Sequence, residues 1–405
     1  MTSNPAAGSA AAVALATTLA IQSYTALAAA AAAVLAPEIA RDLALSPKLI
    51  GVFVGLLYVG GAMASLASGG FIARYGPIRV SQICVLLCAL GLALLPLATC
   101  GGGVDLTLIV LAPIVIGLGY GPITPASSHV LVRTAPPARV ALTFSIKQTG
   151  VPAGVALAGA VLPGLALAFG WRATLIAVAL LGIAIAGVAQ TTRARLDADR
   201  RPDVRLSLTG VLAPLRIVLG NRELIELALT GFAYAATQVC LLSFLVVYLS
   251  EEMGFSLVAA GFALTVANAG GIVGRIGWGA VADRFVRPKI LLGLIGVATG
   301  ACGYLTAGFA VAWPTSALLT ICALFGATAI GWNGVQLAQV ARLAPHGHAG
   351  AVTGAAGFVT FAGVVVGPPV FALLAGATGG YRAGFTAFGS LSLICGLWLL
   401  LTRPK

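Results

Sequence analysis

Arg275 is the residue whose type and surroundings could do chemistry most directly. It lies within residues 270–289, GGIVGRIGWGAVADRFVRPK, in an otherwise apolar stretch that ends about two helical turns later at Asp283. Burying an arginine in a bilayer costs roughly 2.5 to 3.5 kcal/mol on insertion scales. Its planar guanidinium suits a carboxylate held at two points, so we expect Arg275 to bind an anion. The alternatives are a side chain that snorkels to the cytoplasmic face and an ion pair between helices.

Lys147 is a second cation inside an apolar stretch, in the sequence FSIKQTG, and Gln148 follows it. If a helix begins near Val140, Lys147 lies about two turns inside it. We expect it to act as a second anion ligand, and the alternative is again a side chain that reaches back toward the cytoplasmic end. Two buried cations repel unless an anion lies between them or the lysine loses its proton.

Glu226 is the acid that lies well inside an apolar stretch, and it could take up a coupling proton. The alternative is an ion pair with Arg222, because residues four apart share one helix face. No spacing of residues indicates a metal site, a phosphate loop, a dinucleotide site or a nucleophile, so we expect neither an enzyme nor a cofactor.

A set of uncharged polar residues could shape a binding pocket or join helices by hydrogen bonds, and both interpretations stay open. Asn268 and Arg275 are seven residues apart and share one helix face, and Tyr234 and Gln238 share another. We expect the pocket to use Tyr120, Asn268, Gln148, Gln336, Asn333, Tyr234, Gln238 and Gln22. For His129 we favour a structural role.

The elements that position these residues are apolar spans. The 405-residue chain is 60% hydrophobic and only 8% charged, with a mean hydropathy of +1.05, whereas soluble proteins carry about 25% charged residues. A span needs about 20 apolar residues. We expect twelve, at 12–36, 48–70, 80–100, 106–132, 140–168, 172–190, 224–249, 256–281, 290–312, 315–341, 350–375 and 383–402. The composition therefore predicts an all-α membrane protein.

Most Lys and Arg residues fall in loops on one side of these spans, and the positive-inside rule then places both termini in the cytoplasm. This topology explains the net charge of +12 better than nucleic-acid binding does. The first residues lack a positive region, so we expect no cleaved signal peptide. The seven cysteines lie in apolar stretches without a C-x-x-C pair and are expected to be packing residues.

The chain repeats itself. Gly60, Gly69 and Arg74 recur at a constant offset as Gly270, Gly279 and Arg284, whereas Ser65 stands at the position of Arg275. The polar stretch 191–222 separates the two copies, so we predict a six-helix bundle at 1–190, a cytoplasmic linker at 191–222 and a six-helix bundle at 223–405. Parallel repeats of this kind predict a substrate site between the halves and alternating access.

Two six-span halves with a G-x-x-x-D-R turn resemble the major facilitator superfamily. Gly279, Asp283 and Arg284 match that family's loop motif in the second half. Gly69 and Arg74 match it in the first half, where Ala73 replaces the aspartate. The resemblance implies the major facilitator fold and a gating role for these five motif residues.

Within that family, the run from Arg275 to Asp283 is similar to the eighth span of monocarboxylate transporters and oxalate/formate antiporters. The glycine-rich segments 117–121 and 150–154 are similar to their fourth and fifth spans. The resemblance implies that Arg275 contacts a substrate carboxylate. It also implies that Lys147 lies at similar depth on the opposite wall.

We therefore expect a monomeric secondary transporter of small mono- or dicarboxylates in a bacterial-type inner membrane, working by proton symport or anion exchange. A proton-coupled multidrug or cation exporter is the first alternative, although that class usually needs acids in the cavity. The second alternative is a membrane receptor that binds a ligand without transporting it.

Overall fold

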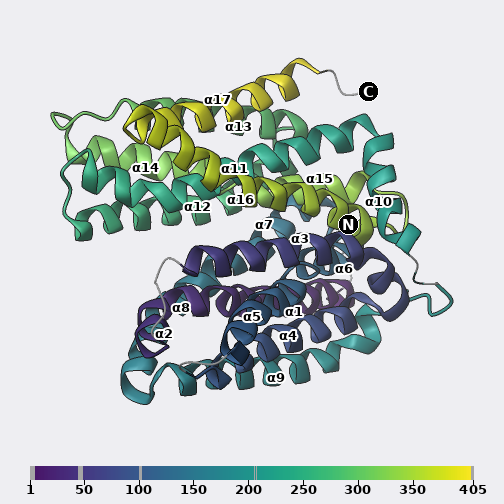
Figure 1. Cartoon of the computed structure of the whole chain (residues 1–405). Helices are drawn as coiled ribbons and strands as arrows, with labels where there is room; N and C mark the ends of the chain where they lie inside the picture. The colour runs from purple at the N-terminus through teal and green to yellow at the C-terminus, as the bar shows by residue number, and fades with distance from the viewer. Residues whose placement is uncertain (1–4, 44–48, 100–102, 205, 207, 403–405) are drawn as a thin grey trace. The chain divides into compact units, whose positions relative to one another are not determined.

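The computed structural model describes residues 5–43, 49–99, 103–204, 206 and 208–402, and these form helices and turns (Figure 1). The helices are α1 (Pro5–Val34), α2 (Ala36–Asp42), α3 (Leu49–Tyr75), α4 (Pro77–Leu94), α5 (Gly103–Tyr120), α6 (Ile123–Thr134), α7 (Val140–Gln148), α8 (Gly150–Phe169), α9 (Trp171–Leu196), α10 (Leu208–Gly220), α11 (Arg222–Glu251), α12 (Leu257–Arg284), α13 (Pro288–Ala307), α14 (Thr315–Ala329), α15 (Asn333–Leu343), α16 (Ala349–Thr378) and α17 (Arg382–Leu401). Two short 3-10 helices, η1 (Leu95–Leu97) and η2 (Pro137–Arg139), join them.

Twelve stretches of the described chain are long and apolar enough to cross a membrane, which confirms the predicted all-α architecture. Three of them contain two α-helices each: α5 with α6, α7 with α8, and α14 with α15. The break after α5 lies at Gly121 and Pro122, and the break after α14 includes Gly331. Because Gly121 and Gly331 are repeat partners, both halves interrupt the same span at the same place.

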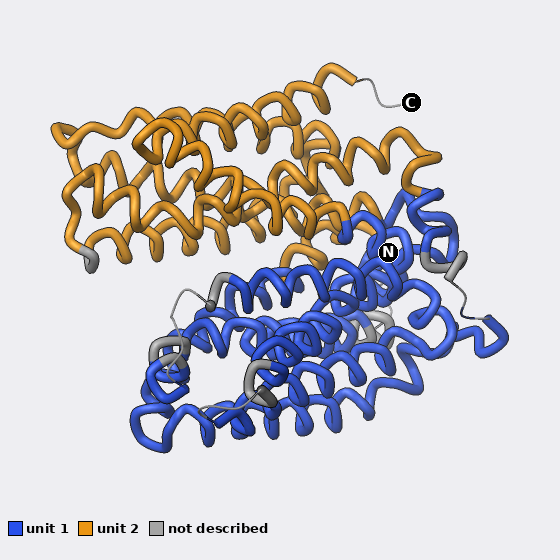
Figure 2. Tube along the Cα trace, in the orientation of Figure 1, with its two compact units in different colours: residues 1–136, 147–217, 341–358 blue, residues 137–146, 218–340, 359–405 orange. Residues whose placement is uncertain are grey.

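The chain packs as two compact units, and each consists of three segments (Figure 2). Unit 1 comprises residues 1–136, 147–217 and 341–358, and unit 2 comprises 137–146, 218–340 and 359–405. Residues 137–146 pack with unit 2, although the residues on either side of them in the chain belong to unit 1. Residues 341–358 pack with unit 1, although the residues on either side of them belong to unit 2. The predicted division by chain order at 190 and 222 stays a prediction.

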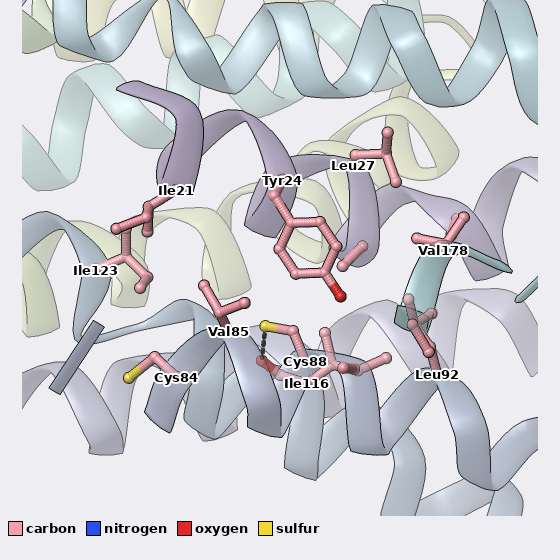
Figure 3. Close-up of a cluster of buried hydrophobic side chains, with 14 of the residues drawn as sticks. Ile21, Tyr24, Leu27, Cys84, Val85, Cys88, Leu92, Ile116, Ile123 and Val178 are labelled. Atoms are coloured by element: carbon pink, nitrogen blue, oxygen red, sulfur yellow. Dashed lines mark hydrogen bonds between the residues drawn. The ribbon is translucent and has the colours of Figure 1, made fainter. Parts of the chain in front are cut away.

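In unit 1, α1 packs on α8 and α9, while α4 packs on α5 and α9. The core between them is apolar, and Tyr24, Cys88 and Ile116 lie in it (Figure 3). A Cβ atom at Gly154 would lie 2.8 Å from the Cβ of Ala26, so only glycine lets α8 approach α1 this closely. Small residues at such crossings are typical of helices that pack in lipid.

In unit 2, α13 packs along α17 and α12 along α14. The core is aromatic: the rings of Phe244 and Phe371 stack at 4.3 Å, and the rings of Phe371 and Phe385 meet edge to face at 5.1 Å. A Cβ atom at Gly274 would overlap the backbone of Ala327 on α14. The close contact between α12 and α14 therefore depends on glycine.

Arg172 of unit 1 and Arg382 of unit 2, which are repeat partners, make equivalent contacts. Arg172 pairs with Asp42 and donates to the carbonyls of Pro96 and Ala98. The hydrogen bond from Arg172, together with one from Trp171, holds the pKa of Asp42 below its usual value.

Arg382 pairs with Glu252 at 3.3 Å and donates to the carbonyls of Ala307 and Phe309. Asp42 and Glu252 are also repeat partners. The internal symmetry read from glycines and arginines thus extends to side-chain contacts.

Candidate functional site

Lys147 lies at the end of α7, is 1% exposed, and contacts two of the predicted pocket residues. Its Nζ donates to Oε1 of Gln22 on α1 at 2.6 Å and to Oε1 of Gln148 at 3.0 Å. Gly150 lies close to the same residue of α1, since a Cβ there would lie 3.1 Å from the Cβ of Gln22. Three residues that were predicted separately are thus brought together.

Both of these partners of Lys147 are amide oxygens, which carry no net charge. Taking an ammonium group out of water costs several kcal/mol, and hydrogen bonds from an ionised donor recover roughly 1.5–3 kcal/mol each. The two amides therefore recover part of the cost of burying this cation.

A cavity of about 200 Å³ lies within unit 1, between α1, α3, α5 and α8. Its lining is apolar apart from two tyrosines, and consists of Ala26, Ala29, Ala30, Ala33, Val54, Leu57, Tyr58, Tyr120, Val151 and Val155. The rings of Tyr58 and Tyr120 meet edge to face at 6.3 Å. The predicted pocket residue Tyr120 therefore does line a cavity, whereas Tyr58 was missed because nothing in its local sequence distinguishes it.

Arg275 is buried inside unit 2, at 2% exposure. Its Nε donates to the carbonyl of Ile330 at 3.0 Å, in the break between α14 and α15 where the helix leaves that oxygen available. This bond uses one of the five N–H donors of the guanidinium. Its burial argues against the snorkelled alternative, and the anion-binding role stays a prediction.

The predicted uncharged pocket residues of unit 2 mostly join helices by hydrogen bonds. The Tyr234 hydroxyl donates to the carbonyl of Leu292 on α13 at 2.8 Å, and Gln336 donates to the carbonyl of Leu227 at 3.2 Å. Both contacts match the helix-joining interpretation of these side chains. Asn268 donates to its own helix, at the carbonyl of Leu264.

Asn333 and Gln238 contact each other in unit 2. The Asn333 amide nitrogen donates to Gln238 Oε1 at 3.2 Å, which links α15 to α11 just beyond the helix break. Both side chains are half-buried. A role for this pair in a pocket wall stays a prediction.

Glu226 is 1% exposed and lies between two cations. Its Oε1 is 3.1 Å from Nε of Arg222, which is the ion pair expected from the spacing of four, and its Oε2 is 2.7 Å from Nζ of Lys289. The sequence did not indicate Lys289, because that residue belongs to the next helix but one. Two ion pairs favour a structural role, and proton coupling by Glu226 stays a prediction.

The second-half loop motif holds the start of α7. The two carboxylate oxygens of Asp283 accept hydrogen bonds from the backbone N–H groups of Ala141 and Leu142, at 3.0 and 2.8 Å. A Cβ at Gly279 would lie 2.6 Å from Ser145 Oγ, so the glycine permits this approach of α12 to α7. A carboxylate at a helix N-terminus is stabilised by the helix dipole. Arg284, the third motif residue, is exposed.

The first-half motif makes different contacts, because Ala73 stands where the second half has Asp283. The Ala73 carbonyl accepts from the backbone N–H of Arg201 at 2.7 Å, and Arg74 donates to the carbonyl of Val204 at 3.1 Å. Both partners belong to the predicted linker. Gly69 lies against Ala351, where a Cβ atom would lie 2.8 Å from its Cα.

Asp197, which the sequence did not single out, caps α4. Its carboxylate accepts from the N–H groups of Ile78 and Arg79 at 2.7 and 3.0 Å. Burial raises the pKa of Asp197, and these two hydrogen bonds oppose that rise. Gly76 precedes α4 with a φ of 92°, and a Cβ there would lie 2.6 Å from an Asp197 carboxylate oxygen.

Asp199 joins His129 and Arg133 of α6. Its Oδ2 lies 2.7 Å from His129 Nε2, and it pairs with the Arg133 guanidinium. Burial raises the pKa of Asp199, but hydrogen bonds from His129 and Arg133 outweigh this effect and leave the pKa below its usual value. The contacts agree with the structural role favoured for His129. No group of three or more metal-capable side chains occurs among the described residues.

Comparison with known proteins gives consistent matches. The family model described as Major Facilitator Superfamily matches residues 13–368. The chain is 23% identical over 391 residues to a hexuronate transporter of Bacillus subtilis (strain 168), covering 92% of this chain and 90% of the relative. It is 26% identical over 340 residues to monocarboxylate transporter 13 of Bos taurus, covering 82% and 74%.

Solved structures share the fold at low identity. The fucose:proton symporter of E. coli superposes with a TM-score of 0.75 at 16% identity, covering 98% of this chain and 100% of the other. A human organic anion transporter superposes with a TM-score of 0.73 at 16% identity, covering 96% and 97%. At such identities the likeness extends to the fold alone.

Proposed function

Because this chain belongs to the major facilitator superfamily and is therefore a multi-pass membrane transporter rather than an enzyme, we propose that it carries small organic anions. The observation that carries the proposal is the burial of one cation in each unit, Lys147 at 1% exposure and Arg275 at 2% exposure, both inside stretches that could cross a membrane. Buried cations within membrane spans mark the pathways of charged substrates, and a carboxylate is the charge that suits them.

We assign the carboxylate-binding role to one cation in each unit, Lys147 in unit 1 and Arg275 in unit 2. Gln22, Gln148 and Tyr120 accompany the first cation. Asn268, with Asn333 and Gln238, is assigned to the second. The printed names of two relatives, a hexuronate and a monocarboxylate transporter, support a carboxylate substrate.

Transport is driven by proton symport or by exchange of anions across a bacterial-type inner membrane, with both termini in the cytoplasm. Gly279, Asp283 and Arg284 of the second half, with Gly69 and Arg74 of the first half, act in gating. The multidrug or cation exporter is less well supported, because Glu226, an acid buried in the span of α11, already pairs with Arg222 and Lys289.

Purified protein is first screened by thermal shift against a panel of carboxylates and organic cations, since a ligand that binds the folded state raises its melting temperature. Hits are then taken up into proteoliposomes with and without a protonophore. Saturable carboxylate uptake is expected. Stabilisation and flux with organic cations alone would support the exporter instead, and stabilisation without any flux would support a receptor.

A further inference from the structure

Lys147 precedes a residue that lines the cavity of unit 1, Val151, by one helical turn, although it does not itself line the cavity. Lys147, Val151 and Val155 recur every four residues along α7 and α8, which places them on one face. Val151 and Val155 line the cavity. Thr149 has right-handed helical dihedral angles, so the register continues across the junction of the two helices.

The same register appears on α1. Gln22, which accepts the hydrogen bond from Lys147, precedes Ala26 by one turn, and Ala26 begins the alanine row that lines the cavity. Side chains one turn apart on a helix lie roughly 5–6 Å from each other. Two helices thus place the cation within about one turn of the cavity wall.

The walls themselves offer little polarity. Eight of the ten lining residues are Ala, Val or Leu, and the tyrosines Tyr58 and Tyr120 are the two that carry a hydroxyl group. A hydroxylated ligand would lose water at each hydroxyl and find few partners, at a cost of roughly 1–3 kcal/mol for each unpaired group. An apolar surface of similar size would gain from the same burial.

Resting on the proposed function, we infer that the preferred substrates are carboxylates with a compact apolar body, which lies in this cavity while the carboxylate faces Lys147. The volume of about 200 Å³ sets the size, since an apolar cavity of roughly 150 Å³ holds a benzene ring. Butyrate and benzoate fit this description. Glucuronate, a sugar acid of the same charge, does not.

The experiment measures binding of acetate, butyrate, benzoate and glucuronate to the full-length protein, followed by competition for uptake. Each buried methylene is expected to tighten binding about fourfold, so butyrate binds about 15-fold more tightly than acetate. Glucuronate produces no shift at a concentration at which benzoate saturates. If glucuronate bound more tightly than butyrate, the inferred preference for apolar substrates would be overturned, whereas the proposed transport of organic anions would not.

Two variants change the cavity in opposite directions. Ala30→Leu fills it and is expected to remove most of the advantage of butyrate and benzoate over acetate, whereas Val151→Ala enlarges it and extends the preference to longer chains. The matched control is Ala20→Leu, on an exposed part of α1 outside the cavity. An equal loss for acetate and butyrate in a folded Ala30→Leu protein would contradict the inference. If none of the four acids binds, the proposed function fails together with it.

Discussion

Lys147 Nζ on α7 lies 2.6 Å from Gln22 Oε1 on α1, so a cation from one segment is solvated by a neutral amide from another. Burying an ammonium group costs several kcal/mol even when it is hydrogen-bonded. We propose that Lys147 is kept buried in order to bind an anionic ligand.

Replacing Lys147 by Met should abolish anion binding, because no ammonium group remains to contact the carboxylate. The matched variant is Lys289→Met. Lys289 pairs with buried Glu226, so removing it leaves that carboxylate with Arg222, whose side chain is largely exposed. The protein should be destabilised, by less than the roughly 3–5 kcal/mol that a fully unpaired buried charge costs. Thermal unfolding and anion binding are measured on both proteins. A Lys147→Met protein that is strongly destabilised yet still binds the anion would show that the lysine is structural.

Replacing Arg275 by Lys keeps the charge but removes the planar guanidinium, which can bind a carboxylate at two points, and its hydrogen bond to the carbonyl of Ile330. Losing one charge-assisted hydrogen bond of roughly 1.5–3 kcal/mol should lower kcat/KM for uptake by about ten- to a hundredfold. Arg216→Lys, at an exposed site on α10, serves as the control and should transport normally. Unchanged uptake by the Arg275→Lys protein would count against the proposal that Arg275 binds the substrate carboxylate.

Replacing Asp283 by Asn should loosen the start of α7, because the amide accepts through one oxygen and has lost the charge that the helix dipole stabilises. A cost of about 0.5–2 kcal/mol is expected. Hydrogen exchange of the peptide covering residues 140–148 should accelerate, while the exposed control Asp203→Asn leaves it unchanged. Exchange that matches the wild type would mean that the carboxylate does not hold this helix.

Replacing Gly76 by Ala should destabilise unit 1, because the backbone has a φ of 92° and the new Cβ would collide with the Asp197 carboxylate. The backbone conformation alone costs an ordinary residue about 1–3 kcal/mol. Gly187→Ala on α9, with open space around its Cβ, should be neutral or stabilising. The two melting temperatures are compared, and a stable Gly76→Ala protein would refute the proposed close packing.

Replacing Glu226 by Gln tests whether this acid carries the coupling proton. Because Arg222 and Lys289 both pair with it, we expect lower thermal stability but unchanged accumulation of substrate under a pH gradient. Uptake into proteoliposomes is measured with an imposed gradient and, separately, by counterflow. Intact counterflow combined with lost gradient-driven accumulation would assign the proton to Glu226 after all.

Several features of this protein follow from the sequence alone. Hydropathy predicted twelve spans, because every stretch that crosses a bilayer must be apolar over its whole length. The repeated glycines predicted two related halves, and the spacing of Arg222 and Glu226 predicted their ion pair. These features depend on neighbouring residues or on a regular spacing along the chain, so they can be predicted from the sequence alone. The burial of Lys147 and Arg275 belongs with them, since both interrupt apolar stretches.

Only the tertiary structure decided which distant residues meet. Gln22 solvates Lys147, Lys289 pairs with Glu226, and Asp197 caps a helix that begins 120 residues earlier at Pro77. Such contacts depend on how each helix is rotated about its axis and how closely its neighbours approach. Those variables are set by the packing of small residues along whole helices, and no single stretch of sequence encodes them.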